Sequence, residues 1–594
     1  RNAPLAIGFA SNDAFKCYSI VDERSAGFFS LGIAQQIKKP VILLCTSGSA
    51  ILNYAPAIAE AFYSQIPLII LSADRPKYKI NIGDGQTIDQ SKVFGNNIFS
   101  SDSLKQDVTH NLKAITISNR QKILNSELEV NEINKLQIKI QKFNEDLLNK
   151  RFNESFVFRK PVHINIPLEE PLYDFIETPC IDLNNKVKFN NEKLIKKIDS
   201  NFENIIEKYS KIMILAGSCS PNYLDDKIID KIKRNSNIVV LTESTSNLHD
   251  DSFFENIDQI IAPVELLKSK NDLFSSLKPE ILITIGGMII SKKIKSFLRN
   301  FPPNIHLHVG INDANDTYFK GVKHVKTTPK IFFEKLLEKT NSASNYHKAW
   351  NTLSKKRFLA HEKFIKKTNY SDLVIFHILS SRIPSKYQVH VANSSPVRYL
   401  QLFKFSKLNN TFCNRGTSGI EGSTSTAVGA SVANNTPTVL ITGDLSFFYD
   451  INGLWNNYIN SDFRIILINN NGGGIFRILP GFKDDEIFSK YIETKHSLNA
   501  KQIAKTYGFK YQNKKTAFGV KFALKTFFKK SNRPKILEIT TPSHLSSSTL
   551  KNYFKFFKKY VVLIGIFAIF STSFAGSYED FFKAVQRDEV KVVS

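Results

Sequence analysis

Cysteine is scarce in this chain of 594 residues, and no two cysteines form a C-x-x-C pair. The five are widely separated along the sequence, at Cys17, Cys45, Cys180, Cys219 and Cys413. This spacing argues against a disulfide framework and against a cysteine-based zinc site. It indicates a protein of a reducing compartment, so we expect a cytoplasmic location.

The sequence also lacks the motifs that would point to dinucleotides or nucleic acids. It contains no G-x-G-x-x-G, and the paired glycines of GGMIISKKIK support a dinucleotide site only weakly. The net charge is +26, but the lysines are scattered through every segment and form no basic stripe interleaved with aromatic residues. We therefore expect no nucleic-acid partner. The basic balance instead suits small polyanionic substrates.

No hydrophobic run has the length of a membrane span. The apolar run from Tyr560 to Phe570 is shorter than the roughly 20 residues that a membrane helix needs. With lysines before it and Ser573-Phe574-Ala575 after it, the run has the layout of a secretory signal peptide, but at the wrong end of the chain. We interpret residues 557–594 as a foreign tail. A genuine membrane anchor is the alternative, and only then would we expect membrane contact.

Short apolar runs alternate with longer amphipathic patterns along the rest of the chain, which is typical of parallel α/β domains. We expect three such domains, at residues 1–178, 179–343 and 344–556, each a parallel sheet flanked by helices. Within the first domain, the spacing of Ile and Leu in the polar segment 118–152 predicts a solvated amphipathic helix.

Two polar clusters follow two apolar runs in the stretch GDLSFFYDINGLWNNYINSDFRIILINNNGGGIF, residues 443–476. The first run ends at Gly443-Asp444 and the second at Asn469, and the segment between them suits a helical crossover between adjacent parallel strands. Both clusters would then lie at the carboxyl edge of one sheet, where open α/β sheets bind ligands. Either cluster alone would be an ordinary turn.

Together the two clusters predict a site for a diphosphate and a magnesium ion. Asp444, Asn470 and the Gly472 carbonyl supply hard oxygen atoms, which suit Mg²⁺ when phosphate and water complete its shell. Leu445 and Ser446 open the following helix, whose free N–H groups can hold a diphosphate. The order and separation of the clusters match the diphosphate–magnesium motif of thiamine diphosphate enzymes.

A thiamine diphosphate cofactor makes a further demand, because its aminopyrimidine needs a carboxylate from the protein. Glu23, in the segment VDERSAGFFSLGIAQQ, is the candidate. A glutamate at the start of a helix is otherwise only a favourable partner for the helix dipole. Its position ahead of the strand-and-turn unit LLCTSGSA favours the functional interpretation.

Further segments extend the likeness in order along residues 1 to about 550: RNAPLAIGF, DERSAGFFSLGIA, TSGSAILNYAPAIAEA, LIILSADRP, QTIDQ, PVHINIPLEEPLY, NSSPVRYL and NRGTSGIEGSTSTAVG. With GDLS and NNNGGGIFRILP, they resemble the 2-succinyl-5-enolpyruvyl-6-hydroxy-3-cyclohexene-1-carboxylate synthases of menaquinone biosynthesis, here called SEPHCHC synthases. The resemblance implies a fold of pyrimidine-binding, central and diphosphate-binding domains. It also implies thiamine diphosphate with Mg²⁺ or Mn²⁺, and a homodimer or homotetramer with active sites between subunits.

The reaction implied is decarboxylation of 2-oxoglutarate and 1,4-addition of the remaining four-carbon unit to isochorismate. The resemblance assigns catalytic roles to Glu23, Gln86, Arg398 and Arg415, and metal binding to Asp444, Asn470 and Gly472. It places Glu23, Ser394, Arg415, Ile420, Asp444, Leu445, Ser446 and Asn470 at the cofactor, with Ile420 supporting its bent form. Substrate contacts would come from Arg1, Arg75, Gln86, Lys292, Lys293, Ser394, Arg398, Ile475 and Phe476.

The chain departs from the family pattern in its first and second domains. The family has a segment before RNAP with a first strand and a serine, so we expect the first sheet to lack that strand. Lys292-Lys293 stands where the family commonly has Lys-Arg, which removes the guanidinium fork. Two alternatives remain: another thiamine diphosphate 2-oxoacid decarboxylase or acetolactate-type synthase, and a non-catalytic fragment or fusion.

Overall fold

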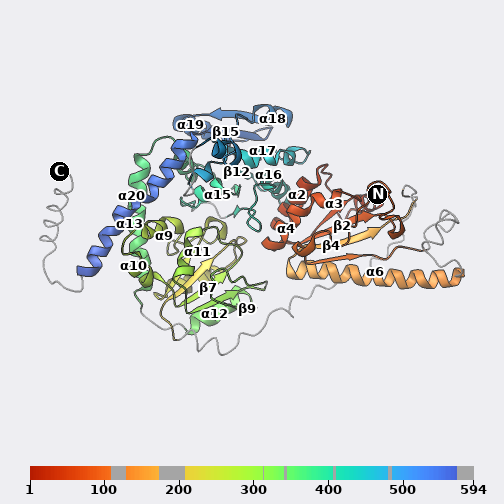
Figure 1. Ribbon diagram of the computed structural model, residues 1–594, viewed down its shortest axis with the longest axis horizontal. Coiled ribbons are helices and arrows are strands. Elements are labelled where there is room, and N and C mark those ends of the chain that lie inside the picture. The colour runs from red at the N-terminus through yellow and green to blue at the C-terminus, as the bar shows by residue number, and fades with distance from the viewer. Residues whose placement is uncertain are drawn as a thin grey trace.

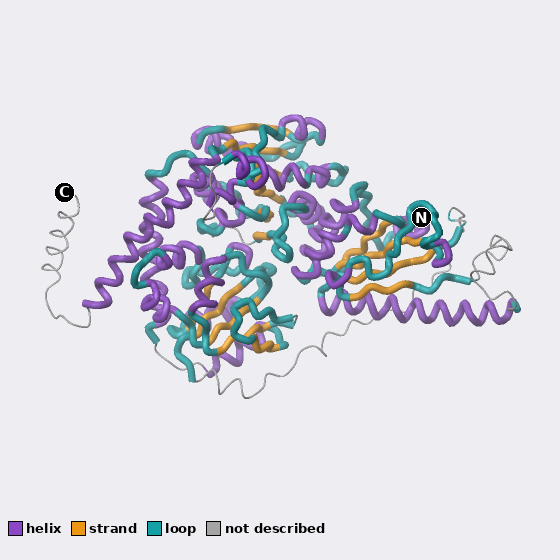
Figure 2. The backbone as a smooth tube through the Cα atoms, viewed as in Figure 1, coloured by secondary structure: helices purple, strands orange, loops and turns teal. Residues whose placement is uncertain are grey.

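Three parallel sheets form the framework of the molecule, and they stand apart as three groups of strands in Figure 2. The computed structural model describes residues 1–108, 129–170, 172, 208–311, 313–339, 344–405, 410–478 and 485–570. Within these ranges every pairing between named strands is parallel, and helices flank each sheet. The predicted α/β fold of three parallel-sheet units is confirmed.

The first sheet has the strand order β1-β2-β4-β3, and its strand β2 is buried along its whole length. Helix α6 runs along this sheet, below it at the right of Figure 1, and confirms the predicted amphipathic helix. The part of segment 118–152 that precedes residue 129 lies outside the described residues. The elements are α1 (Ala3–Ala10), α2 (Glu23–Ile37), β1 (Val41–Cys45), α3 (Ala50–Asn53), α4 (Ala55–Ser64), β2 (Leu68–Asp74), β3 (Ser100–Ser103), α6 (Val130–Phe158) and β4 (Val162–Pro167).

The central sheet has the order β6-β5-β7-β8-β9. Strands β5 and β6 are buried throughout, as their continuous Ile, Val and Leu runs predict for strands covered on both faces. The elements are β5 (Ile212–Ala216), α8 (Asp226–Lys233), β6 (Ile238–Leu241), α9 (Ile257–Glu265), α10 (Lys270–Leu277), β7 (Ile281–Ile285), α11 (Lys292–Asn300), β8 (Ile305–Val309), β9 (Val322–Val325) and α12 (Pro329–Lys339).

The third sheet has the order β11-β10-β12-β13-β15-β14 and contains both segments of the predicted cofactor motif. Its strands are β10 (Gln388–Val391), β11 (Thr411–Phe412), β12 (Thr438–Gly443), β13 (Arg464–Asn469), β14 (Lys510–Lys514) and β15 (Lys535–Thr540). Its helices are α13 (Tyr346–Lys366), α14 (Asp372–Ser380), α15 (Ser395–Leu400), α16 (Ser423–Ala433), α17 (Asp444–Tyr449), α18 (Lys501–Thr506), α19 (Ala517–Phe527) and α20 (Ser543–Phe570).

Helix α20 is the long helix beside α13 in Figure 1, and the two helices pack together. The boundary expected at residues 556 and 557 falls inside α20, where Phe557 is buried in the core of the third domain. The rest of the expected tail, residues 571–594, lies outside the described residues. In the part of the chain that the structure describes, no helix has both the length and the apolar character needed to cross a membrane.

Helices α2 and α16 join the first domain to the third at very close range. A Cβ atom built on Gly32 of α2 would lie 2.1 Å from the carbonyl oxygen of Thr426, and one built on Gly429 of α16 would lie 1.9 Å from that of Phe29. Because real Cβ contacts are far longer, any side chain at either position would push the helices apart. The two glycines therefore set the distance between these domains.

Glu243 is a buried carboxylate that supports the start of helix α11. It follows strand β6 and is only 3% exposed. Its Oε2 accepts a hydrogen bond from the Ile290 amide and its Oε1 one from the Ser291 amide, both at 2.7 Å. Burial raises the pKa of Glu243 to about 7, although the two backbone bonds act in the opposite direction. This carboxylate therefore ties the central sheet to the segment that carries Lys292.

The raised pKa of Glu243 predicts a pH dependence of stability. The folded chain binds this proton more tightly than the unfolded chain, so the stabilisation is greatest at low pH and is lost as the pH rises from the ordinary value of 4.5 to about 7. We expect wild type to lose up to about 3 kcal/mol relative to Glu243→Gln over this window. Thermal unfolding of both proteins between pH 4 and 7.5 measures the difference. A difference that does not change with pH would contradict the shifted pKa.

Candidate active site

The two predicted motif segments meet at one edge of the third sheet. Strands β12 and β13 are neighbours, with Gly443 paired to Ile468. Asp444 begins helix α17 directly after β12, and Asn470 follows β13. Because the strands are parallel, their carboxyl ends share one edge, which brings together side chains that are separate in the sequence.

Asp444 is almost completely buried, at 3% exposure, and its carboxylate is held in place. Its Oδ1 accepts from the Leu445 amide at 2.8 Å, and its Oδ2 accepts from the Gly472 amide at 2.9 Å. His496 Nε2 lies 3.3 Å from the same Oδ2. The contact with Gly472 ties the two motif segments directly to each other.

Asn470 is oriented by a neighbour that the sequence did not reveal. Its amide nitrogen donates to Oδ2 of Asp372 at 3.1 Å, and Asp372 also accepts from the Thr541 hydroxyl. The pKa of Asp372 is raised, chiefly by burial and against these hydrogen bonds. Oδ1 of Asn470 is left buried with no hydrogen-bond partner among the described residues. Such an oxygen costs free energy unless a ligand satisfies it.

The donors at this edge fit a magnesium ion bound together with a diphosphate. Asp444 offers a carboxylate, Asn470 its unpartnered amide oxygen, and Gly472 a carbonyl at a backbone φ of +147°. The described residues contain no group of three or more His, Cys, Asp or Glu side chains that could hold a metal. One carboxylate with neutral oxygens is nevertheless the set that Mg²⁺ takes when phosphate and water supply the remaining ligands.

A cavity of about 130 Å³ lies over this edge and collects the predicted cofactor residues. Ser446 in its wall donates to the Ile420 carbonyl at 2.6 Å. Ser394 precedes α15 with a φ of +70°, a conformation that a non-glycine residue adopts only when its surroundings enforce it. The predicted residues that line it are Ser394, Ile420, Asp444, Leu445, Ser446, Asn470, Gly472, Ile475 and Phe476.

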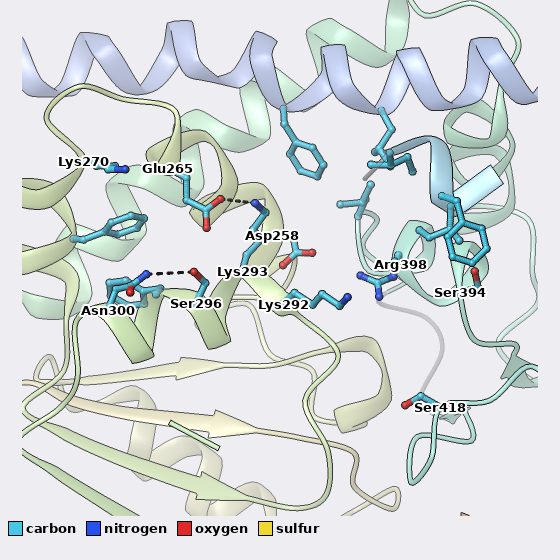
Figure 3. A pocket seen from close by; sticks show the side chains of 18 of the residues that line it. Asp258, Glu265, Lys270, Lys292, Lys293, Ser296, Asn300, Ser394, Arg398 and Ser418 are labelled. Atoms are coloured by element: carbon cyan, nitrogen blue, oxygen red, sulfur yellow. Dashed lines mark hydrogen bonds and ion pairs between the residues drawn. The ribbon is translucent and has the colours of Figure 1, made fainter. Parts of the chain in front are cut away.

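A second cavity of about 1490 Å³ lies next to the first and shares part of its wall. Figure 3 shows it between the central and third domains, with α20 passing over it and contributing Leu550 and Phe554. Ser394, Ile420, Ile475 and Phe476 line both cavities. The predicted substrate residues Lys292, Lys293, Arg398 and Arg415 line the larger one. The predicted cofactor and substrate residues of the central and third domains therefore line two adjacent cavities with a common wall.

Positive charge is concentrated in the larger cavity. Figure 3 shows the charged ends of Lys292 and Arg398 pointing toward one another. Burial lowers the pKa of the Arg398 guanidinium, with Asp258 acting to raise it and Arg415 to lower it further. Lys293 instead forms an ion pair with Glu265. Cations held close together and partly away from water favour the binding of an anion.

Four predicted residues lie in the first domain and line neither cavity. Arg75 donates to the Ser47 hydroxyl and to the Gln86 carbonyl, both at 2.7 Å. The pKa of the Arg1 α-amino group is lowered by burial, then by the charge of the Arg1 side chain and then by that of Arg75. Arg1 and Arg75 therefore lie near one another. Glu23 begins α2 and receives a 3.4 Å hydrogen bond from the Asn53 amide. The predicted site is therefore divided between two parts of the chain.

Sequence reasoning missed several residues of the site. Asp372 orients Asn470, His496 contacts Asp444, and Asp258 lines the larger cavity. None of them stands in a motif, and each is brought to the site by an element distant in the sequence. No sequence signal would have singled them out.

Comparisons with known proteins agree with this geometry. Residues 1–93 match the thiamine pyrophosphate enzyme N-terminal TPP binding domain, and residues 394–539 match the corresponding C-terminal TPP binding domain. The second match contains both segments at the sheet edge. With the three-sheet fold, the two matches define a thiamine diphosphate enzyme, and the predicted cofactor class is confirmed.

Curated relatives narrow the class to a family. The chain is 45% identical to the 2-succinyl-5-enolpyruvyl-6-hydroxy-3-cyclohexene-1-carboxylate synthase of Christiangramia forsetii, over 94% of this chain and 95% of the relative. The synthase of Flavobacterium psychrophilum is also 45% identical, over 93% and 94% of the two chains. That of Porphyromonas gingivalis is 34% identical, over 94% and 93%. The chain belongs to the SEPHCHC synthase family, as its motifs predicted.

The buried donor set predicts that Asp444 is required for metal-dependent cofactor binding. Asp444→Asn keeps the size of the side chain but removes its charge. We expect the affinity for thiamine diphosphate in the presence of Mg²⁺ to fall by about 10–100-fold or more. Mutating a residue that only contacts a metal ligand already lowers metal affinity or activity by this factor. Calorimetric titration measures the affinity, with the exposed Glu486→Gln as a matched control. Equal affinities for the two variants would remove Asp444 from the metal site.

Proposed function

We propose that this chain joins 2-oxoglutarate to isochorismate in menaquinone biosynthesis, using thiamine diphosphate and Mg²⁺ or Mn²⁺. In this reaction 2-oxoglutarate loses CO₂, and its remaining four-carbon unit adds to isochorismate by 1,4-addition. The observation that carries the proposal is a pair of adjacent cavities that share part of their walls, a small one with hard oxygen donors and a large one lined with cations. Membership of the SEPHCHC synthase family supports the same substrates.

We assign the smaller cavity to the cofactor. Asp444, Asn470 and the Gly472 carbonyl would hold the metal, with the amides of Leu445 and Ser446 near the diphosphate. Ile420 stands at the junction of the two cavities and would support the thiazolium end, beside Ser394. Thiamine diphosphate, when bound, would supply the electron sink that decarboxylation requires. The protein would supply orientation and exclude water.

We assign the larger cavity to the two acidic substrates. Both carry carboxylates, and Arg398 and Arg415 can each present a bidentate fork to such a group. Lys292 would add a third cation on the opposite wall. Lys293 pairs with Glu265 and so is a weaker candidate for a substrate contact. Ile475 and Phe476 would form the apolar wall against the ring of isochorismate and the carbon chain of 2-oxoglutarate.

We propose that the active enzyme is at least a homodimer. Glu23, Arg1, Arg75 and Gln86 line neither cavity of their own chain, yet the reaction needs a carboxylate at the cofactor. A second copy that presents its first domain to the cavities would complete the site. The first domain would then bind the pyrimidine and the third the diphosphate. This arrangement would place Glu23 at the cofactor and Arg1, Arg75 and Gln86 at the substrates.

A cytoplasmic location is consistent with the cysteines. Cys17, Cys45, Cys219 and Cys413 are all free thiols, and three of them are buried. Burial raises the pKa of the Cys45 and Cys413 thiols to about 12, so neither is a reactive thiolate. Unpaired thiols of this kind suit a reducing compartment.

The direct test of the proposal is a product assay on the purified chain with thiamine diphosphate and Mg²⁺. We expect isochorismate to be consumed only when 2-oxoglutarate is present, with release of CO₂ and formation of an adduct carrying four additional carbons. Mass spectrometry identifies the adduct, and the loss of isochorismate absorbance measures the consumption of isochorismate. Release of CO₂ without loss of isochorismate would instead indicate a plain 2-oxoacid decarboxylase.

A shared site predicts complementation between two inactive variants. Glu23→Gln and Asp444→Asn should each abolish turnover alone, the first while keeping cofactor binding. If Glu23 serves the partner's cofactor, a mixed dimer regains one intact site, and random mixing should restore about a quarter of wild-type activity. Turnover after co-refolding or subunit exchange measures this. A mixture with no activity would place Glu23 and Asp444 in the site of a single chain.

A further inference from the structure

Glu60 is a buried carboxylate to which the proposed reaction assigns no role. It lies on helix α4 of the first domain and is 1% exposed. A charged side chain is almost never buried to this degree unless it is fully hydrogen bonded. Its partners therefore indicate what it does.

The partners of Glu60 belong mostly to the third domain. Its Oε1 accepts from the Gly416 amide at 2.8 Å, and its Oε2 accepts from the Thr417 amide at 2.7 Å and the Thr417 hydroxyl at 2.9 Å. The Ser64 hydroxyl, one turn along α4, donates to Oε1 at 2.5 Å. Three of the four hydrogen bonds thus cross from one domain to a single loop of the other.

The same loop also packs closely against the backbone of helix α4. A Cβ atom built on Gly416 would lie 2.6 Å from the Glu60 carbonyl oxygen and 2.9 Å from the Ser64 amide nitrogen. Both neighbours are backbone atoms of a helix, which cannot move aside cheaply. A glycine is therefore required where the loop meets the carboxylate, and this close fit is independent of the hydrogen bonds.

Arg415, the residue just before this contact, lines the larger cavity. On its other side the loop is held by Asn393, whose amide nitrogen donates to the carbonyls of Asn414 and Gly419, both at 2.7 Å. Oδ1 of Asn393 accepts from Nη1 of Arg415 at 2.6 Å. Arg415 thus lies between an attachment within its own domain and a second one, through Glu60, to the first domain.

We propose that Glu60 is a positioning residue for Arg415, which fixes the arginine at the substrate cavity from another domain. This inference rests on the proposed function, in which Arg415 receives a substrate carboxylate. Among the described residues, the hydrogen bonds of Glu60 involve Ser64, Gly416 and Thr417 and none of the proposed metal ligands, so its effect should fall on the substrates and not on the cofactor. The contact also couples the docking of the first domain to the geometry of the cavity.

The chemistry of the contact makes Glu60→Gln a sharp test. Glutamine has nearly the same shape, but it offers one acceptor oxygen and turns the other position into an NH₂ donor. That donor would face either the Gly416 amide or the Thr417 amide and hydroxyl, so at least one N–H is left unsatisfied. The exposed Glu145→Gln on helix α6 is a matched control for the loss of one carboxylate.

For Glu60→Gln we expect kcat/KM for the acidic substrates to fall roughly 10–100-fold, as for a misplaced substrate-binding group. The Kd for thiamine diphosphate with Mg²⁺ should stay within about twofold of wild type. A double-mutant cycle with Arg415→Ala separates positioning from general support, since Glu60→Gln should cost little more once Arg415 is absent. Additive losses, or a Glu60→Gln enzyme equal to wild type, would overturn the proposal.

Hydrogen exchange of backbone amides provides a second test of the attachment, one that does not depend on turnover. Amides in a peptide covering residues 413–420 should exchange faster in Glu60→Gln than in wild type or Glu145→Gln. If wild type turns over neither substrate, the proposed function fails while the exchange result still decides whether Glu60 holds the loop. If Glu60→Gln does not fold, Thr417→Val removes one of the three bonds and should show smaller changes of the same kind. Unchanged exchange in the folded variant would exclude the attachment.

Discussion

The parallel pairing of strands β12 and β13 is the constraint on which the rest of the site depends. Parallel neighbours end at the same edge of a sheet, so the residues that follow them must face a common space. Asp444 and Asn470 occupy these two positions, and the bond from the Gly472 amide to Asp444 joins the two segments. A shift in the register of either strand would separate the proposed metal donors even if every motif residue were kept.

The electrostatics of the site follow from this edge and from the docking of the central domain against it. The proposed metal donors are oxygens buried at the sheet edge, whereas the larger cavity is lined by cations from two domains. The buried Glu243 and the partly buried Asp258 accept hydrogen bonds from the residues just before Lys292 and so hold this cationic segment in place. Separating the two kinds of group suits a reaction that binds a metal–diphosphate at one end and carboxylates at the other.

Docking of the first domain onto the third is equally specific. Gly32 and Gly429 allow α2 and α16 to touch, and Glu60 binds the loop that carries Arg415. Each contact joins backbone to backbone or backbone to a buried carboxylate, where a small displacement is costly. The first domain therefore helps to shape the larger cavity of its own chain, which we assign to the substrates, even though Glu23, Arg75 and Gln86 do not line it.

The amino-acid sequence by itself determined the fold class, the sheet edge that carries the site and the family. The sequence determines these features because they depend on local patterns. The periodicity of strands and helices, the Gly-Asp pair and the Asn-Gly run each reflect the backbone geometry of a few neighbouring residues. The motif and the family resemblance then identified Asp444, Asn470 and the cationic residues Lys292, Lys293, Arg398 and Arg415, which line two adjacent cavities in the structure.

Only the tertiary structure decided which distant residues complete the site. Asp372 orients Asn470 from 98 positions away, Glu60 binds Thr417 from 357 positions away, and α20 passes over the larger cavity. It also divided the predicted residues, because Glu23, Arg1, Arg75 and Gln86 line neither cavity of their own chain. Such contacts depend on how complete surfaces dock together, and no local periodicity encodes them.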